Sequence, residues 1–116
     1  MLQTIEAKLK EVVEPVFYGS ADDVGNAALW NYIVFFRANT KRSETNKGWS
    51  DYYTVALVHE DWVPLDLVEK VVEKLEAIPG MHMAKSDIDY NYTRKPSTNA
   101  VVEIASIPFV HARKKV

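Results

Sequence analysis

The residue types that could carry chemistry in this sequence gather first at His59, which is followed by Glu60 and Asp61. An imidazole beside two carboxylates could bind a metal ion or form an acid–base pair. Adjacent residues at the end of a strand point in different directions, however, and no second histidine stands four residues away on a helix. We therefore interpret this cluster as the polar end of a strand and expect no metal site.

A second pair of candidates is Asp87 and Asp89, which stand two residues apart in an alternating segment. Two carboxylates on one strand face can perform acid–base catalysis. The other residues on that face are polar as well, which favours a solvated outer face of a sheet. The sequence has no cysteine, its serines lack the G-x-S-x-G pattern, and its four glycines form no phosphate-binding loop. We expect a protein that is not an enzyme and uses no cofactor.

The composition is that of one globular domain covering residues 1–116, with 47% hydrophobic and 26% charged residues. Charged residues interrupt the apolar positions of residues 1–15, so this segment does not resemble a signal peptide. No apolar run approaches the roughly 20 residues of a membrane span. We expect a cytoplasmic product that makes no membrane contact.

Two amphipathic helices are predicted from apolar residues spaced three and four apart. The first covers residues 2–14 and ends at Pro15, and Val16–Tyr18 could then be extended. The second begins at Pro64, and its buried stripe is expected to run from Leu65 to Ile78.

Two antiparallel hairpins alternate with these helices. The first joins strands from Trp30 to Asn39 and from Trp49 to His59 through the charged connection Thr40 to Gly48. The second joins a strand from Ala84 to Tyr92, with Tyr90 and Tyr92 facing the core, to a strand from Ala100 to Ile107. Pro108 should then place the following segment on an edge or outside the sheet. The order α-ββ-α-ββ predicts an α+β fold, a mostly antiparallel sheet of about four strands with two helices on one face.

The charged residues are divided between separate parts of the chain, although the net charge is only −2. Basic residues gather in the first hairpin connection and near residue 115, and acidic residues gather on the second helix. Trp62 has no evident place in a core and could either staple the second helix or anchor a partner. The residues that we assign to an assembly interface are Lys41, Arg42, Lys47, Trp62, Asp66, Glu69, Glu73, Arg113, Lys114 and Lys115.

The aromatic residues of the first hairpin have three interpretations. They include Trp30, Tyr32, Trp49 and Tyr52. Cross-strand packing inside a hairpin accounts for them, and a protein interface is a second reading. Base stacking beside the basic connection is a third, and the overall acidity of the chain disfavours it.

With these elements in order, the sequence resembles the small tail-terminator and tail-completion proteins of long-tailed bacteriophages, of the lambda U type. The resemblance extends over nearly the whole chain. It rests on the amphipathic first helix, the aromatic first hairpin with its long charged connection, the Pro64–Ile78 helix, and the tyrosine-rich strand that leads into VVEIASIPFVHARKKV.

The resemblance implies a non-enzymatic structural protein of the virion tail that is assembled in the host cytoplasm. Such proteins form a ring, usually a hexamer, which caps the tail tube and joins it to the head connector. The implied partners are further copies of the chain, the tail tube protein and the head–tail connector protein. A ring requires two different patches that meet between neighbours, and the basic connection and acidic second helix could supply them.

On this reading Lys41, Arg42 and Lys47 project from a mobile loop and become ordered against a neighbouring subunit or the tube. Alternatively, the loop lines the lumen and faces the phosphates of passing DNA. The competing hypothesis for the whole chain is a small, non-enzymatic ligand- or partner-binding regulatory module of the same α+β type.

Overall fold

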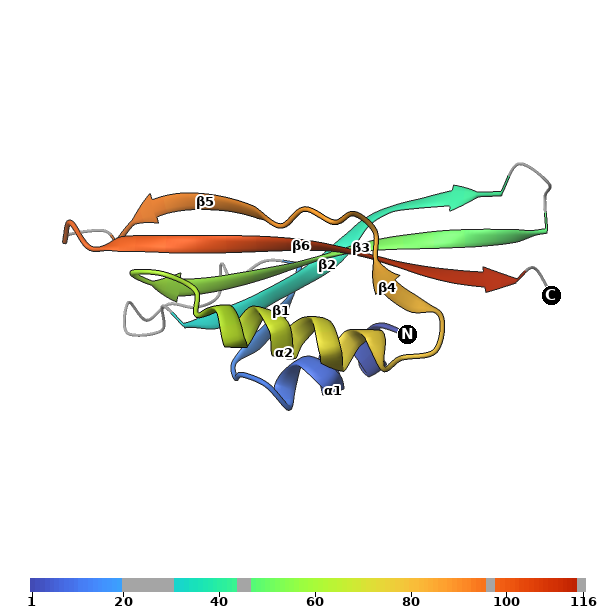
Figure 1. Cartoon of the computed structure of the whole chain (residues 1–116), viewed down its shortest axis with the longest axis horizontal. Helices are drawn as coiled ribbons and strands as arrows, with labels where there is room; N and C mark the ends of the chain where they lie inside the picture. Colours follow the sequence, from blue (N-terminus) through green and yellow to red (C-terminus); the bar gives the residue numbers. More distant parts are fainter. Residues whose placement is uncertain (20–30, 44–46, 96–97, 115–116) are drawn as a thin grey trace.

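The computed structural model describes residues 1–19, 31–43, 47–95 and 98–114, which form two helices and a six-stranded sheet (Figure 1). The elements in chain order are α1 (Leu2–Lys10), β1 (Val16–Tyr18), β2 (Tyr32–Arg42), β3 (Gly48–Glu60), α2 (Leu65–Glu76), β4 (Met81–Met83), β5 (Asp89–Arg94) and β6 (Val101–Lys114). The predicted α+β class is confirmed. The sheet has six strands where about four were expected, because β1 and β4 are additional short strands.

The sheet is mixed but mostly antiparallel, with strand order β1-β2-β3-β6-β4. The short strand β1 runs parallel to β2, and every other pair is antiparallel. Both β4 and β5 pair with β6, β4 opposite residues 109–111 and β5 opposite residues 101–106. The long strands β2, β3 and β6 therefore form the frame that carries the rest of the molecule.

Both helices pack on the same face of the sheet, as expected (Figure 1). Ile5 and Leu9 are buried on α1, and Val68, Val71 and Leu75 are buried on α2. These spacings of three and four residues place the apolar side chains on one stripe of each helix. The sheet contributes Ile33 and Phe35 from β2, Tyr53, Val55 and Leu57 from β3, and Ala105, Ile107 and Phe109 from β6.

The helices are shorter than predicted. The helix expected over residues 2–14 ends at Lys10, and the backbone N–H groups of Val12 and Val13 both donate to Leu9 in a closing turn. Pro64 is the residue before the first turn of α2, so its extended backbone leads into the helix instead of forming it. None of the described helices is long and apolar enough to cross a membrane.

The strand predicted from Ala84 to Tyr92 is wrong in its bounds and in its burial. Strand β5 begins only at Asp89, and all six of its residues are exposed. Tyr90 lies opposite Ala105 of β6, on the face that the helices cover farther along the sheet. The alternating pattern correctly predicted that Tyr90 and Tyr92 share one face of the sheet. Beside β5, however, no described element covers that face. Tyr90 and Tyr92 therefore lie on the surface.

The expectation for Pro108 is also wrong, since β6 continues through it to Lys114. Pro108 lies opposite Thr54 of β3, and its carbonyl accepts a hydrogen bond from the N–H of Ala84 at 2.9 Å. The nitrogen and carbonyl of one strand residue point to the same side. The nitrogen of Pro108 therefore faces the gap between β4 and β5, where its missing N–H leaves the β3–β6 ladder intact.

Candidate functional site

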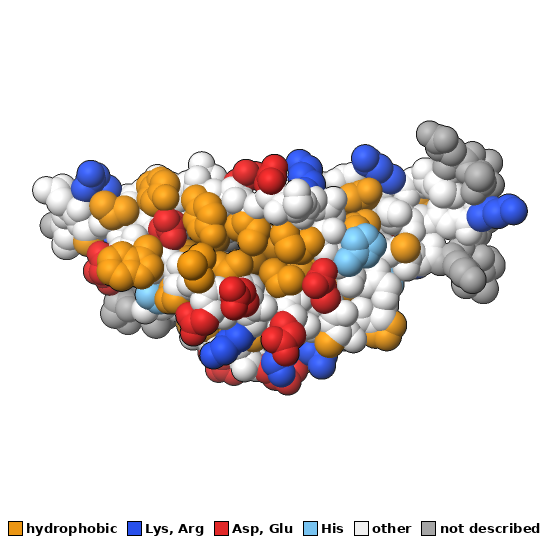
Figure 2. Space-filling view, in the orientation of Figure 1, with side chains coloured by type: hydrophobic (Ala, Val, Ile, Leu, Met, Phe, Trp, Pro, Cys, Tyr) orange, Lys and Arg blue, Asp and Glu red, His pale blue; other side chains and the backbone are white. Residues whose placement is uncertain are grey.

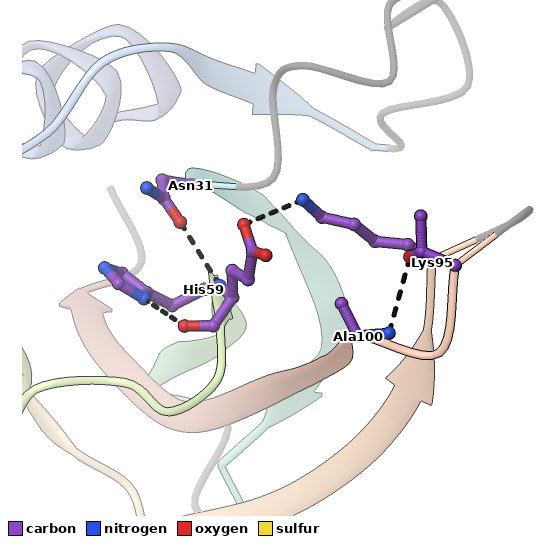
Figure 3. A network of polar contacts seen from close by, with 6 residues as sticks. Asn31, His59, Lys95 and Ala100 are labelled. Atoms are coloured by element: carbon purple, nitrogen blue, oxygen red, sulfur yellow. Dashed lines mark hydrogen bonds and ion pairs between the residues drawn. The ribbon is translucent and has the colours of Figure 1, made fainter.

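His59, the first candidate for chemistry, contacts the backbone at the end of β3. Nδ1 of His59 lies 2.8 Å from the carbonyl oxygen of Glu60, and Asp87 and Asp89 are exposed, with Asp87 preceding β5. Across the described ranges, no group of three His, Asp or Glu side chains could hold a metal ion. His59 and Glu60 are instead part of a polar network (Figure 3).

That network joins the end of β3 to its neighbours (Figure 3). The carboxylate of Glu60 pairs with Nζ of Lys95 at 2.7 Å, and the backbone N–H of Glu60 donates to Oδ1 of Asn31 at 3.2 Å. The N–H of Lys95 donates to the carbonyl of Ala100 at 3.1 Å. These contacts fasten the β5–β6 hairpin and the start of β2 to the end of β3.

The basic residues lie at the other end of the molecule, on a three-stranded projection that we call the arm. It comprises the described residues 37–43, 47–51 and 111–114 of β2, β3, β6 and their flanking turn. Figure 1 shows it extending beyond the helices, beside the C-terminus. The prediction that Lys41 and Arg42 project from a mobile loop is wrong, because both belong to β2 and pair with β3.

Trp49 is the centre of the arm. Arg42 and Arg113 are its partners in the flanking strands. Their guanidinium carbons lie over the indole at 5.6 Å and 5.5 Å from the ring centroid, respectively. A cation within about 6 Å of an aromatic ring is attracted by the ring's electron-rich face. Nζ of Lys41 lies similarly over Tyr52, at 5.2 Å.

A β-bulge decides which of these cations share a face. The register of β2 against β3 shifts between Arg37 and Asn39. An extra residue reverses the alternation of side chains beyond it. Arg42 therefore lies on the same face as Trp49, and Lys41 lies on the opposite face, near Tyr52. Without the bulge, strict alternation would place Lys41 on the face of Trp49 and Arg42 on the opposite face.

The arm is held to β6 by an ion pair between Asp51 and Arg113, with Nε and Oδ2 2.6 Å apart. Oγ1 of Thr40 also donates to Asp51, at 2.9 Å. The hydrogen bond from Arg113 is the main reason that the pKa of Asp51 lies below its ordinary value; burial opposes it, and Thr40 adds to the lowering. The same pair raises the pKa of Arg113, which stays cationic. Strands β2, β3 and β6 are thus linked by side chains.

The charged side chains described in the arm are mostly cationic. Arg37, Lys41, Arg42, Lys47 and Arg113 are exposed, while Asp51 is engaged by Arg113. Of the other two predicted interface cations, Lys114 pairs through its backbone with Gly48. Lys115 lies outside the described residues.

At the opposite end, four large hydrophobic side chains among the described residues are exposed, and we call them the Trp62 surface. They are Trp62 (68% exposed), Leu65 (72%), Tyr90 (39%) and Tyr92 (64%). The expected burial of Leu65 is wrong, because the residue lies on the first turn of α2, where no described element covers it. Figure 2 shows a broad hydrophobic area between β5 and α2 on this side of the molecule.

Glu103 of β6 fixes the position of this surface. Its Oε1 accepts a hydrogen bond from the backbone N–H of Val63 at 2.8 Å. Glu103 also lies opposite Tyr92 in the β5–β6 ladder, and its carboxylate raises the pKa of that phenol. Trp62 precedes Val63 and follows Asp61, which has a φ of 70°. This left-handed conformation is uncommon for non-glycine residues and turns the chain sharply after β3.

An acidic stripe adjoins the Trp62 surface. Asp66, Glu69 and Glu73 are exposed and spaced three and four residues apart on α2, so they share one side of the helix. Lys74 of α2 is directed instead toward α1, where it pairs with Glu11 at 3.4 Å. Acidic side chains are seen along α2 in Figure 2. The structure thus places the predicted acidic residues together, beside Leu65.

The arm and the Trp62 surface are far apart. They are separated by the length of β3, which at about 3.3 Å per residue spans roughly 40 Å between Trp49 and Trp62. The molecule itself measures 52 × 26 × 24 Å. The two surfaces therefore lie toward opposite ends of its long axis and cannot contact one another within one molecule.

A cleft of about 360 Å³ lies between the turn after α1, the start of α2 and the sheet. Its wall includes Val12, His59, Asp66, Leu67 and Lys70. The volume falls in the lower range of small-ligand pockets. The cleft is half open, and it brings an acid, a base and an imidazole to one apolar depression.

The sequence matches no protein-family model and no curated protein. The candidate surfaces are therefore assessed from their own geometry. The sequence pattern located the cations, Trp62 and the acidic stripe. It missed the exposure of Leu65, Tyr90 and Tyr92 and the role of Glu103, since a single acid in an alternating strand carries no signal of its backbone partner.

Proposed function

We propose that this protein is a structural assembly protein of a phage or prophage tail. In this role it is a tail terminator that forms a ring, caps the tail tube and joins it to the head connector. The observation that carries the proposal is the placement of a cationic arm and an acidic, apolar surface at opposite ends of a 52 Å molecule. The resemblance to tail-terminator proteins in order of elements and in the aromatic, charged hairpin supports the same role.

Two different surfaces on one chain favour a ring over a two-fold dimer. A two-fold dimer joins one patch to the same patch on the partner, whereas a head-to-tail contact joins different patches and closes into a ring when the rotation permits. Placing two arms together would bring like charges into contact, which costs several kcal/mol across an interface. Joining unlike surfaces avoids this repulsion.

The contacts around Trp49 favour protein over DNA as the partner of the arm. Both guanidinium groups near Trp49 lie over its ring, so a nucleic-acid base would have to displace them to stack there. Protein docking leaves these contacts in place. We therefore propose that the arm makes protein contacts within the ring. DNA binding by the arm in the lumen is the alternative outcome of the experiment below.

Electron microscopy of negatively stained protein tests the proposal directly. Concentrated protein should form rings of uniform size, and these should cap one end of purified tail tubes and stop their elongation. The variant Lys41→Glu/Arg42→Glu/Lys47→Glu should stay folded and lose ring formation and capping. Lys10→Glu/Lys85→Glu, which reverses two exposed charges outside the arm and the stripe, should behave as the wild type. If rings and caps survive the triple change while binding of duplex DNA is lost, the arm serves the lumen instead.

A second candidate function is a small, non-enzymatic regulatory module that binds a ligand in the helix–sheet cleft. The cleft volume of about 360 Å³ and the adjacent Asp66, Lys70 and His59 favour it. A stoichiometric small molecule retained through purification, with monomeric protein at all concentrations, is the result that this candidate predicts. Native mass spectrometry separates the two functions in one experiment.

A further inference from the structure

We infer that the arm of one copy docks on the Trp62 surface and acidic stripe of the next copy. This inference rests on the proposed function in one respect, namely that copies of the chain assemble. It adds the identity of the two surfaces that meet and the residues that face one another.

Charge is the first argument. The exposed cations of the arm include Arg42 and Lys47, and the stripe presents Asp66, Glu69 and Glu73. Lys74 pairs with Glu11 in the turn after α1, and the exposed Lys70 is the cation beside the stripe, so three carboxylates face one cation there. Complementary potentials of this kind speed association and fix the register of two surfaces.

The apolar content of the second surface is the next argument. Trp62 and Leu65 expose about two-thirds or more of their area. Tyr92 lies opposite Glu103 in the β5–β6 ladder, and Glu103 bonds to Val63, the residue after Trp62. Exposed apolar clusters bordered by charge are typical of protein-binding sites. Aromatic residues near the centre of such a patch contribute most of the binding energy. Charge alone therefore does not account for this end of the molecule.

The arm and the Trp62 surface are both held in place before they dock. The arm carries Trp49 between two guanidinium groups and is fastened by the Asp51–Arg113 pair. The Trp62 surface is fastened through Glu103. Surfaces that are rigid before binding lose less conformational entropy when they dock.

A second copy is the partner that these observations favour over an unrelated protein. Each surface finds its complement in sign and chemistry on the same chain, and the distance of roughly 40 Å along β3 prevents pairing within one molecule. The acidic stripe repels nucleic acid, so a polyanion fits only the arm.

The test uses two full-length charge-reversed variants. The arm variant is Arg42→Glu/Lys47→Glu, and the stripe variant is Asp66→Lys/Glu69→Lys. Each alone brings like charges together at every contact, so each should associate at least about 100-fold more weakly than the wild type. An equimolar mixture restores opposite charges at both kinds of contact and should form assemblies that contain the two variants in equal amounts. Sedimentation velocity and native mass spectrometry give the size and composition.

Lys10→Glu/Lys85→Glu is the matched control for charge, because both residues are exposed and lie outside the two surfaces, and it should assemble as the wild type does. Circular dichroism and thermal unfolding establish whether each variant is folded. Lys47→Ala takes the place of an arm variant that does not fold, and Glu69→Ala takes the place of a stripe variant that does not fold. Assembly by either charge-reversed variant alone at wild-type strength, or a mixture that stays monomeric while the wild type assembles, overturns the inference and leaves the ring proposal standing. A wild type that remains monomeric at every concentration overturns both.

Discussion

The carboxylate of Glu103 accepts a hydrogen bond from the backbone N–H of Val63 at 2.8 Å, which ties the turn carrying Trp62 to the long strand β6. Glu103 also lies opposite Tyr92 of β5 in the ladder. One residue thus adjoins two parts of the proposed docking surface that are 30 residues apart in sequence, Trp62 and Tyr92.

Glu103→Ala should lower the free energy of unfolding by about 1–3 kcal/mol, because the N–H of Val63 loses its partner. Glu103→Gln keeps an acceptor oxygen and should cost less than about 1 kcal/mol. Urea unfolding measures both. In the alanine variant the pKa of Tyr92 should also fall toward that of an ordinary tyrosine, which NMR titration of ring-labelled protein records. Equal destabilisation by Glu103→Ala and Glu103→Gln would show that the hydrogen bond to the N–H of Val63 does not account for the loss of stability.

Trp62→Ala should abolish assembly while leaving the fold intact. The indole is 68% exposed, so its loss should change the free energy of unfolding by no more than about 0.5 kcal/mol. Sedimentation velocity and thermal unfolding measure the two effects separately. Tyr18→Ser removes an aromatic ring that is 47% exposed outside the Trp62 surface and serves as the control. Loss of assembly in both variants would point to a general loss of surface hydrophobicity.

The Asp51–Arg113 pair predicts a pH dependence. The pKa of Asp51 is lower in the folded protein than the roughly 3.9 of an unfolded chain, so acid favours unfolding. Its stabilisation should be complete above about pH 5 and disappear as the pH falls through the lower folded-state pKa. The gap in thermal midpoint between the wild type and Asp51→Asn should therefore close below about pH 4. A gap that is constant from pH 7 to pH 3 would exclude this assignment.

Leu9→Ala tests the attachment of α1 to the sheet. Leu9 is fully buried in the core with Ile5, and truncating a buried leucine costs about 2–5 kcal/mol. Leu65→Ala removes the same atoms from a residue that is 72% exposed and should cost less than about 0.5 kcal/mol. Urea unfolding of the two variants compares a buried with an exposed leucine. Similar costs would contradict the burial seen in the structure.

Sequence periodicity predicted the elements whose one face is buried against a partner. The stripe of Val68, Val71 and Leu75 gave α2, and alternation gave β2 and β3, because burial imposes a helical or a strand period. The same reasoning failed for Leu65 and Tyr92. A pattern shows which residues share a face, but it does not show whether another element covers that face.

The remaining errors arose from backbone features that lack a side-chain signal. The bulge after Arg37 moves Arg42 to the face of Trp49, and a period of two cannot anticipate it. Pro108 reads as a strand breaker, but its nitrogen faces the gap between two short strands. The chemistry of the arm and stripe could be read from the sequence, whereas their separation along β3 required the fold.

We propose that copies of this chain assemble head to tail through unlike surfaces. Native mass spectrometry of the wild-type protein over a concentration series is its most direct test. The account predicts one closed oligomer with more than two subunits, without a stable two-fold dimer on the way. A two-fold dimer that neither grows nor weakens when Arg42 or Trp62 is replaced would contradict it.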